Sequence, residues 1–269
     1  IGFDGHPVGS VDGAESNLPV VNAVDYFSFD GSQPAPRREV VAMASCNDCH
    51  KNLNFHGNNR NGNVQHCVIC HNPNATDMEA RPFDAGGEDG IDLAATLDGK
   101  VEESIHFKHM IHAIHAGDAD EYGFREDGVV LYGYNKSVHD YRGVRYPQSL
   151  ANCEACHQEG TYTLDAQPAS VLATTVDSQA TATEEAAGFP AANILANATD
   201  PADDLNISPE AATCLGCHDG AQAHMEVAGG AVFDQTQEVI DSTVFESCGE
   251  CHGEGGPVPV SSAHAQAVP

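Results

Sequence analysis

Residues 46–50 read Cys-Asn-Asp-Cys-His, and the chain contains five copies of this C-x-x-C-H pattern, which together use all ten of its cysteines. The copies are Cys46-Cys49-His50, Cys67-Cys70-His71, Cys153-Cys156-His157, Cys214-Cys217-His218 and Cys248-Cys251-His252. In such a motif the two thiols add across the vinyl groups of one porphyrin, and the adjacent histidine becomes the proximal ligand of the haem iron. The sequence therefore predicts five covalently bound haem c groups.

Three other uses of C-x-x-C pairs explain the pattern less well. Structural zinc takes four ligands, often from two such pairs, and five pairs do not divide into sites of that kind. A thioredoxin-like redox pair needs a βαβ setting and occurs once, and a disulfide framework would not place histidine after every pair. We therefore expect neither disulfides nor free thiols in the haem-loaded chain.

The composition agrees with a fold built around haems. Of the 269 residues 41% are hydrophobic and 6% aromatic, and tryptophan is absent, which is thin material for a conventional core of this size. Five porphyrins would supply the missing apolar surface, at about 54 residues per haem (269/5). We expect a multihaem cytochrome c fold, mostly irregular, with short α-helices that wrap a stack of five haems, and a small N-terminal β segment.

The charge balance argues against two classes of partner. Lysine and arginine number 11 against 40 aspartates and glutamates, a net charge of −29 (11 − 40), whereas nucleic acids and anionic lipids attract basic surfaces. No apolar run approaches 18 residues, so no membrane-spanning helix is expected. We interpret the acidity as a source of solubility or an adaptation to salt, and alternatively as steering for cationic partners.

Two domains are expected: a β segment over residues 1–42, which carry no haem motif, and a pentahaem domain over residues 43–269. Valine and aromatic residues predict a β-strand from Leu18 to Phe29, with Arg38–Ala42 as a second strand. Because one hairpin is marginal in water, this strand is expected to pair with β-structure outside the haem-binding region. The stretch between Gln167 and Asp204 lacks periodicity and predicts an extended surface loop.

Second axial ligands for the five irons are available in excess. The histidines outside the motifs are His6, His56, His66, His106, His109, His112, His115, His139, His224 and His264. The methionines are Met43, Met78, Met110 and Met225. Methionine ligation would raise the reduction potential, but histidine is plentiful enough to predict bis-histidine iron throughout.

Four of these histidines recur at every third position, at 106, 109, 112 and 115. The segment from Val101 to Ala116 is rich in helix formers and predicts an α-helix with Gly117 as its C-cap. Residues three apart share a helix face but are rotated by about 60°, so two of them can reach two neighbouring haems. His66, which precedes Cys67, and His139, in a tyrosine-rich loop, remain open as alternatives, as do His106 and His109.

Longer stretches around the motifs carry a family resemblance. They are C-N-D-C-H-K-N-L-N-F-H-G-N-N-R from Cys46, C-V-I-C-H-N-P-N-A-T-D from Cys67, F-K-H-M-I-H-A-I-H-A-G from Phe107, Y-P-Q-S-L-A-N-C-E-A-C-H from Tyr146, C-L-G-C-H-D from Cys214, A-H-M from Ala223 and E-S-C-G-E-C-H-G from Glu246. Residues 38–264 resemble the OmcA/MtrC family of decahaem cytochromes on the bacterial outer membrane, and the N-terminal stretch resembles the end of that family's β-barrel domain.

The resemblance implies one distal ligand for each haem. These ligands are His56 of the H-G-x-x-R segment, His112 and His115 of M-I-H-x-I-H, His224 of A-H-M, and the C-terminal His264. Family members carry ten haems in four domains, whereas this chain has five motifs in about one. It therefore corresponds to a C-terminal fragment, a pentahaem relative, or a subunit whose haem chain continues into a neighbour.

The expected function is electron transfer. Iron with two histidine ligands has no open position for a substrate, so no catalytic residue is expected, and electrons would pass along the haems. The resemblance implies a place at the outer cell surface, with metal oxides, flavins or chelated metals as acceptors, and other multihaem cytochromes or copies of this chain as partners. The alternatives are a multihaem reductase with one open haem, which the regular motifs disfavour, and a filament subunit.

Overall fold

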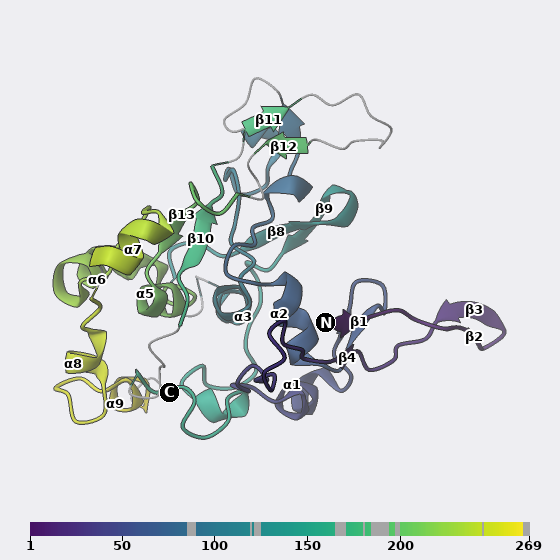
Figure 1. Cartoon of the computed structure of the whole chain (residues 1–269), viewed down its shortest axis with the longest axis horizontal. Helices are drawn as coiled ribbons and strands as arrows, with labels where there is room; N and C mark the ends of the chain where they lie inside the picture. Colours follow the sequence, from purple (N-terminus) through teal and green to yellow (C-terminus); the bar gives the residue numbers. More distant parts are fainter. Residues whose placement is uncertain are drawn as a thin grey trace. The chain divides into compact units, whose positions relative to one another are not determined.

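The computed structural model describes most of the chain, in the ranges 1–84, 90–118, 120, 125–164, 171–179, 181–183, 194–196, 200–243 and 245–265. The chain divides into two compact units. Unit 1 comprises residues 1–71 and 152–167, and unit 2 comprises residues 72–151 and 168–269. Their elements are labelled in Figure 1.

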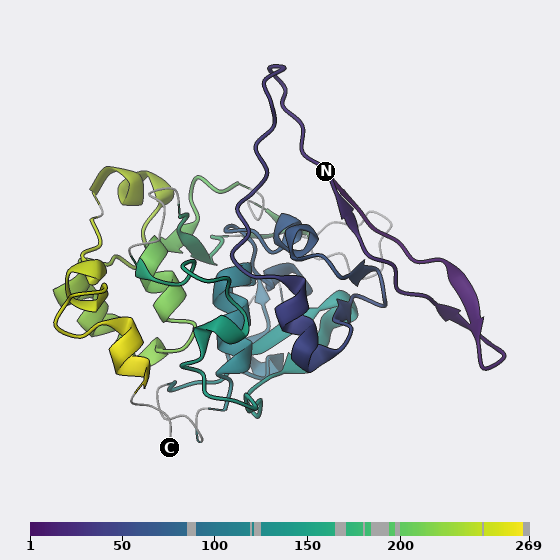
Figure 2. The same cartoon turned by 90° about the horizontal axis from the view of Figure 1, so that it is seen from below.

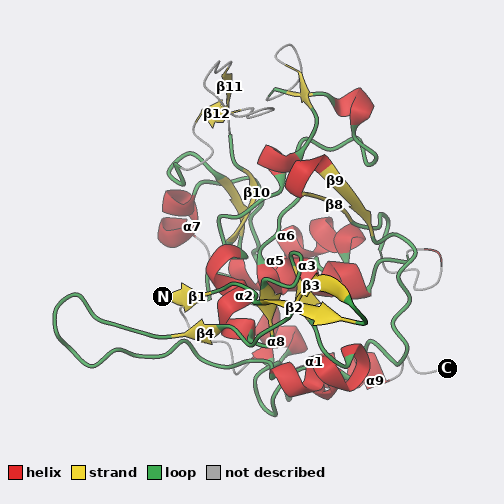
Figure 3. Cartoon of the chain, turned by 90° about the vertical axis from the view of Figure 1, so that its right-hand side faces the viewer, coloured by secondary structure: helices red, strands yellow, loops and turns green. Residues whose placement is uncertain are grey.

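Short helices and two-stranded sheets make up the regular structure, joined by long irregular segments (Figure 3). The helices are α1 (Met43–His50), α2 (Val64–Cys70), α3 (Phe107–His115), α5 (Pro209–Cys214), α6 (Gln222–Gly229), α7 (Gln237–Thr243), α8 (Cys248–His252) and α9 (Val260–Ala265). The 3-10 turns are η1 (Met78–Ala80), η2 (Leu93–Ala95), η3 (Tyr134–Lys136), η4 (Cys153–Ala155) and η6 (Asp219–Ala221). This is the mostly irregular fold with short helices that the composition predicts.

Each strand of the described residues pairs with one antiparallel partner. The pairs are β1 (Gly2–Phe3) with β4 (Ala23–Val24), β2 (Val8–Val11) with β3 (Ala14–Asn17), β5 (Asn54–Phe55) with β6 (Arg60–Asn61), β8 (Val130–Gly133) with β9 (Ser137–Asp140), β10 (Thr174–Asp177) with β13 (Leu205–Ile207), and β11 (Thr181–Thr183) with β12 (Ile194–Ala196). Sheets this small cannot bury a core by themselves.

The predicted strand from Leu18 to Phe29 is wrong over most of its length. Only β4 forms, and it pairs with β1 of the same unit rather than with β-structure elsewhere. The side chain of Asn22 donates to the carbonyl oxygens of Phe3 (3.2 Å) and Asn59 (3.0 Å), so side-chain hydrogen bonds anchor this segment where a ladder was expected. Phe29 is 96% exposed, so the apolar pattern did not signal burial.

Other parts of the N-terminal segment also depart from the expectation. Residues 38–42 form no second strand, and Val41 makes a single bridge to His157 instead. The hairpin of β2 and β3 and the loop that follows β4 run outward as two arms of unit 1 (Figure 2). The β segment is therefore a set of short, mostly exposed pairings that rest on the region around α2.

Between Gln167 and Asp204 the prediction of an extended surface loop is wrong where the structure describes the chain. Strand β10 pairs with β13, and Thr174 and Thr175 are fully buried. The hydroxyl of Thr175 donates to the side-chain oxygen of Asn206 (2.9 Å), so polar pairs replace the apolar periodicity that sequence patterns detect. Parts of this stretch lie outside the described residues.

The predicted helix from Val101 to Ala116 is shorter than expected. It begins at Phe107, because residues 103–105 hydrogen-bond in extended form to residues 75–77. Gly117 is not its C-cap, a position that Ala116 takes. A side chain at 117 would meet the carbonyl oxygen of Tyr141 at 2.1 Å, so close backbone approach is what requires this glycine.

The apolar side chains of the described residues cluster in unit 2. Its clusters are Ile207, Ala211, Ala212, Leu215, Met225 and Ala231; Met110, Ala113, Val129 and Leu131; and Met78 with Ile91. In unit 1, which carries three of the haem motifs, Val64 is the one buried hydrophobic side chain among the described residues. Unit 1 therefore needs apolar material beyond its own side chains, as the composition predicts.

A buried guanidinium braces unit 2. Arg81 pairs with Asp77 (Nε to Oδ1, 2.7 Å) and Asp98 (Nη1 to Oδ1, 2.9 Å), and also donates to the carbonyl of Lys100 (2.7 Å). Its guanidinium lies 4.8 Å from the ring centroid of Tyr132. Because the Asp77 side chain is fully buried and that of Asp98 is 8% exposed, removal of the guanidinium would leave two carboxylates in the interior without their counter-charge.

We therefore expect Arg81→Met to lower the free energy of unfolding by about 3–5 kcal/mol. The matched control is Arg142→Met, which breaks an exposed ion pair with Asp140 and should leave that free energy almost unchanged. Urea unfolding of the haem-loaded protein checks both. Equal effects of the two variants would show that Arg81 is not a structural brace.

Candidate haem sites

The five cysteine motifs lie on short helical turns. The first is on α1, the second on α2 and the fifth on α8, while the third begins with η4 and the fourth begins at the last residue of α5. In a helical turn, positions i, i+3 and i+4 share one face. Both thiols and the histidine of each motif can therefore face one porphyrin.

The first cysteine of each motif lies in a position that favours its uncharged thiol over the thiolate. Burial raises the pKa of the first thiol in every motif, to about 11 for Cys214 and about 12 for Cys248. A buried site disfavours a thiolate, whereas a thioether carries no charge. These positions therefore fit covalent attachment to a porphyrin better than thiolate coordination of a metal.

In unit 1 a distant histidine faces the histidine of the second motif. The ring of His56 lies 6.2 Å from the ring of His71, between centroids. His56 is placed by the turn that joins β5 and β6, where it and Gly57 adopt left-handed φ angles of 53° and 66°. Such a backbone conformation is costly for a histidine and marks a constrained position.

Two further pairs of this kind occur in unit 2. The ring centroids of His218 and His264 lie 6.1 Å apart, and those of His224 and His252 lie 6.2 Å apart. His264 donates from Nδ1 to the carbonyl of Val260 (2.8 Å), and His252 donates in the same way to Val258 (2.9 Å). In its neutral form each of these rings has its lone pair on Nε2, the arrangement common among metal-ligating histidines.

The spacing within all three pairs fits one metal between two imidazoles. A metal–nitrogen bond is about 2.0 Å, and an imidazole centroid lies roughly 1 Å from its nitrogen. Two rings on opposite sides of one iron are therefore about 6 Å apart, as observed. Burial, followed by the charge of His264, lowers the pKa of His218 and favours the neutral form that ligation requires.

The two pairs of unit 2 are linked crosswise. His218, a motif histidine, is joined to His224 of the other pair by six residue steps (224 − 218) through η6. His252, the other motif histidine, is joined back to His264 by twelve (264 − 252). Each motif is therefore connected by a short segment to the distant histidine that faces the other motif.

Helix α3 carries His112 and His115 in its last turn. His115 donates from Nδ1 to the carbonyl of Ile111 (2.8 Å), so its neutral ring also has its lone pair on Nε2, and it lies edge-on to Tyr146 at 5.6 Å. The Cβ of His112 lies so close to Gly216 that a side chain at 216 would approach it to 2.6 Å. The helix is thus fixed against residues 214–218 of the fourth motif, which we call the fourth haem-attachment loop.

The alternative histidines have polar partners of their own. His109 places Nδ1 3.1 Å from the carbonyl of Ala212 and Nε2 3.7 Å from Glu103. The remaining contacts are His66 Nε2 to Asp4 (3.8 Å), His106 Nδ1 to the Thr174 hydroxyl (2.8 Å) and His139 Nε2 to the Ser137 hydroxyl (3.1 Å). Each of these rings therefore has a polar contact that accounts for its position without iron ligation.

A carboxylate that the sequence did not point to ties the last two motifs together. Glu246, which precedes the fifth motif, accepts from the Ser208 hydroxyl and the Ala211 amide through Oε1, and from the Glu210 amide through Oε2, each at 2.8 Å. It thereby caps the N-terminus of α5, the helix that ends in the first cysteine of the fourth motif. The contact is distant in sequence, and no local pattern marks it.

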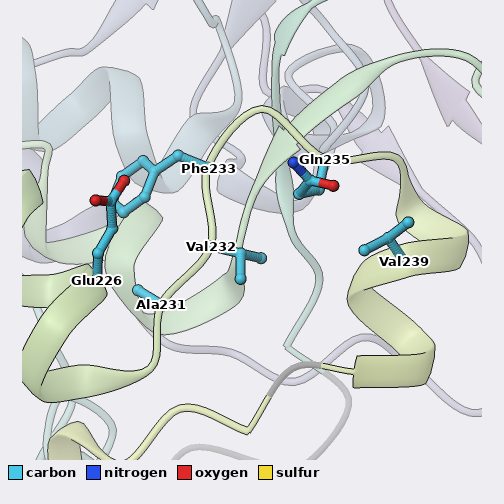
Figure 4. A pocket seen from close by; sticks show the side chains of 6 residues that line it. All are labelled: Glu226, Ala231, Val232, Phe233, Gln235 and Val239. Atoms are coloured by element: carbon cyan, nitrogen blue, oxygen red, sulfur yellow. The ribbon is translucent and has the colours of Figure 1, made fainter.

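The described residues also form one hollow away from the predicted haem residues. A hollow of about 280 Å³ beside α6 is lined by Glu226, Ala231, Val232, Phe233, Gln235 and Val239 (Figure 4), and none of the predicted haem residues lines it. No group of three or more His, Cys, Asp or Glu side chains in the described ranges is arranged to hold a metal ion. Nor does any helix there have the length and apolar character to cross a membrane.

Comparison with known proteins identifies the family. The sequence profile for outer membrane cytochromes of the MtrC/MtrF-like type, domains II/IV, matches residues 38–265. The chain belongs to the OmcA/MtrC family. The haem motifs and the histidine pairs thus lie in a domain of a multihaem c-type cytochrome, whose cofactor is covalently attached haem.

Two solved structures are similar to this chain. The outer membrane decahaem cytochrome OmcA is 17% identical with a TM-score of 0.42, over 94% of this chain and 31% of OmcA. MtrC from Shewanella baltica OS185 is 18% identical with a TM-score of 0.36, over 93% of this chain and 33% of MtrC. The chain thus spans about a third of either cytochrome. No protein of curated function matches it.

If the three observed pairs hold iron, replacement of the distant histidine should disturb one haem at a time. We expect His56→Ala, His224→Ala and His264→Ala each to convert one haem from low-spin to high-spin, because each removes one axial ligand. The matched control is His139→Ala, on an exposed strand, which should leave all haems low-spin. Electron paramagnetic resonance of the ferric protein checks this, and an unchanged spectrum would contradict the pairing.

Two neighbouring carboxyl groups before α3 have opposite pKa shifts. Burial raises the pKa of Glu102 to about 7, although the amide and hydroxyl of Ser178 donate to it. Burial would also raise that of Glu103, but the hydrogen bond with His109 and the charge of Lys100 outweigh it and lower the pKa to about 2. Ordinary glutamate titrates near 4.5.

These shifts predict opposite dependences of stability on pH. The cost of ionising Glu102 grows above pH 4.5 and is complete above about pH 7, so Glu102→Gln should raise the free energy of unfolding at pH 8 and not at pH 4. Glu103 stabilises the fold above pH 4.5 and loses this contribution as the pH falls towards 2, so Glu103→Gln should lower that free energy at pH 8. Urea unfolding at both pH values would contradict this if the variants changed in the same direction.

Proposed function

We propose that this chain is a pentahaem electron-conducting domain of an outer membrane cytochrome. The observation that carries the proposal is the set of three pairings between a motif histidine and a distant histidine, each at 6.1–6.2 Å between ring centroids. Membership of the OmcA/MtrC family supports the same conclusion.

The cysteines and histidines of the proposed haem sites limit the reactions that this chain can support. Haem c, when bound, supplies one-electron oxidation and reduction of its iron. The cysteines of each motif would hold one haem on a short helical turn, and two histidines per iron would leave no coordination position for a substrate. The polypeptide would then hold redox centres without supporting bond-breaking chemistry, which is the arrangement an electron conduit needs.

Five haems follow from five complete motifs with enough distal ligands. His56, His224 and His264 serve the haems of His71, His252 and His218, the motif histidines that they face. His112 and His115 serve two further haems, because two residues three apart on one helix cannot bind both faces of one ring. The haems would form a continuous stack wrapped by short helices.

The partners follow from the family and from the charge. We propose that the domain works at the outer cell surface, takes electrons from other multihaem cytochromes or copies of itself, and passes them to metal oxides, flavins or chelated metals at exposed haem edges. A net charge of −29 favours cationic partners and surfaces. The same proposal includes terminal metal reduction at an exposed haem edge. It also includes conduction along a polymer or filament of copies, which differs only in how the chains assemble.

A reductase with one open haem is the alternative function. It requires at least one motif histidine whose iron keeps a vacant face, and multihaem enzymes of that type commonly alter the motif there. All five motifs here are regular, and the histidine pairs described above favour six-coordinate iron. No specific observation favours the enzyme.

Intact mass and spin state test the proposal together. We expect the mature protein to carry five haem additions and to be entirely low-spin when ferric. His112→Ala and His115→Ala should each make one haem high-spin, and the haem should differ between the two variants. A mass with fewer additions, or a high-spin signal in the unmodified protein, would contradict the pentahaem conduit and favour the reductase.

A further inference from the structure

The buried guanidinium of Arg125 donates hydrogen bonds to the fourth haem-attachment loop. Its side chain is 5% exposed, and its Nη1 donates to the carbonyl oxygens of Gly216 (2.6 Å) and Leu215 (3.4 Å), inside the motif. Its Nη2 lies 3.2 Å from Oδ2 of Asp219, the residue that follows the motif histidine His218. One cation therefore binds the loop on both sides of the second cysteine.

Asp219 completes the clamp. Its carboxylate accepts from the backbone amides of Glu126 (2.6 Å) and Asp127 (3.2 Å), while Nε of Arg125 donates to the carbonyl of Asp127 (2.8 Å). The Glu126 carboxylate lies directly beside this segment, 2.8 Å from where a Cβ at Gly220 would stand. Both charges are therefore held at fixed positions beside the loop.

Helix α3 fixes the same loop from another side. A Cβ at Gly216 would approach the Cβ of His112 to 2.6 Å and the carbonyl oxygen of His109 to 3.2 Å, so the loop needs glycine at this position. Held between α3 and Arg125, the loop cannot move away from the guanidinium. The position of this charge pair relative to the fourth motif is thus built into the fold.

A fixed charge beside a haem changes its reduction potential. Ferrous haem carries one positive charge less than ferric haem, so a nearby cation favours the reduced form and a nearby anion favours the oxidised form. The effect is strong where water is excluded, and burial and electrostatics are known levers on haem potentials. The chain has only 11 basic residues against 40 acidic ones, so its average composition does not account for a buried arginine beside a haem-attachment loop.

We propose that Arg125 and Asp219 set the reduction potential of the haem attached through Cys214 and Cys217, with Arg125 raising it and Asp219 lowering it. The inference rests on the proposed function, since it requires a haem at this motif. Both are positioning residues that act through charge and through the attachment loop, not as ligands of iron.

Variants of opposite charge sign provide the test. In spectroelectrochemical titration of the haem-loaded protein, Arg125→Gln should lower the midpoint of one haem, and Asp219→Asn should raise it. We expect about a tenfold change in the reduction equilibrium constant in each case, equivalent to 59 mV for a one-electron couple. The other four haems should shift much less.

The exposed ion pair of Arg142 and Asp140 supplies matched controls. Arg142→Gln and Asp140→Asn make the same changes of net charge in unit 2 on a solvent-exposed pair, where screening should keep every midpoint near its original value. Arg125→Lys keeps the charge but loses the fork of donors. It should retain the potential, and Asp219→Asn preserves the test if Arg125→Gln does not fold.

The outcomes separate this inference from the proposed function. Midpoints that move in opposite directions for Arg125→Gln and Asp219→Asn support the charge pair. Shifts in the same direction, or no larger than those of the controls, would overturn it even though five low-spin haems are present. A mass spectrum without a haem on the fourth motif would instead overturn the proposed function.

Discussion

The pairing of a motif histidine with a second histidine from elsewhere in the chain is the interaction on which the proposed haem sites depend. A motif histidine alone fixes one face of a haem, and the second ligand must come from elsewhere in the chain. The three pairs at 6.1–6.2 Å bring together residues from 15 to 46 positions apart (71 − 56; 264 − 218). Each such link closes a loop of chain, which replaces the large sheet or helix bundle that usually orders a domain of this size.

The distribution of apolar side chains follows from the same constraint. Unit 2 holds clusters around Met110, Ile207 and Met78, while unit 1 buries Val64 alone among the described hydrophobic residues. Polar anchors such as Asn22 hold unit 1 together, and haem bound as proposed would add apolar cofactor faces and covalent attachment. The buried brace of Arg81 serves the same end, because buried charges are tolerated only when each is fully paired.

The five C-x-x-C-H motifs can be identified from local sequence alone, because each occupies five consecutive residues. The predicted distal histidines cannot be identified in this way. Spacing along α3 predicts only that two haems are served, and His56, His224 and His264 are implied by the resemblance to the family. The contacts of Glu246 and Arg125 join residues tens of positions apart, and no local pattern encodes them.

The errors in secondary structure have a common cause. The strand expected from Leu18 to Phe29 is replaced by side-chain anchors, the helix expected from Val101 is shortened by extended pairing with residues 75–77, and the loop expected after Gln167 contains buried threonines. In each case hydrogen bonds to distant segments outweigh local propensity.

Near-infrared magnetic circular dichroism of the fully oxidised protein tests the central claim most directly, because the porphyrin-to-iron charge-transfer band identifies the axial ligands of low-spin haem. If every iron lies between two histidines, the spectrum contains the bis-histidine band alone, with an intensity that corresponds to all the haems counted by mass. A band from histidine–methionine ligation, or intensity that accounts for only part of the haem, would contradict the account.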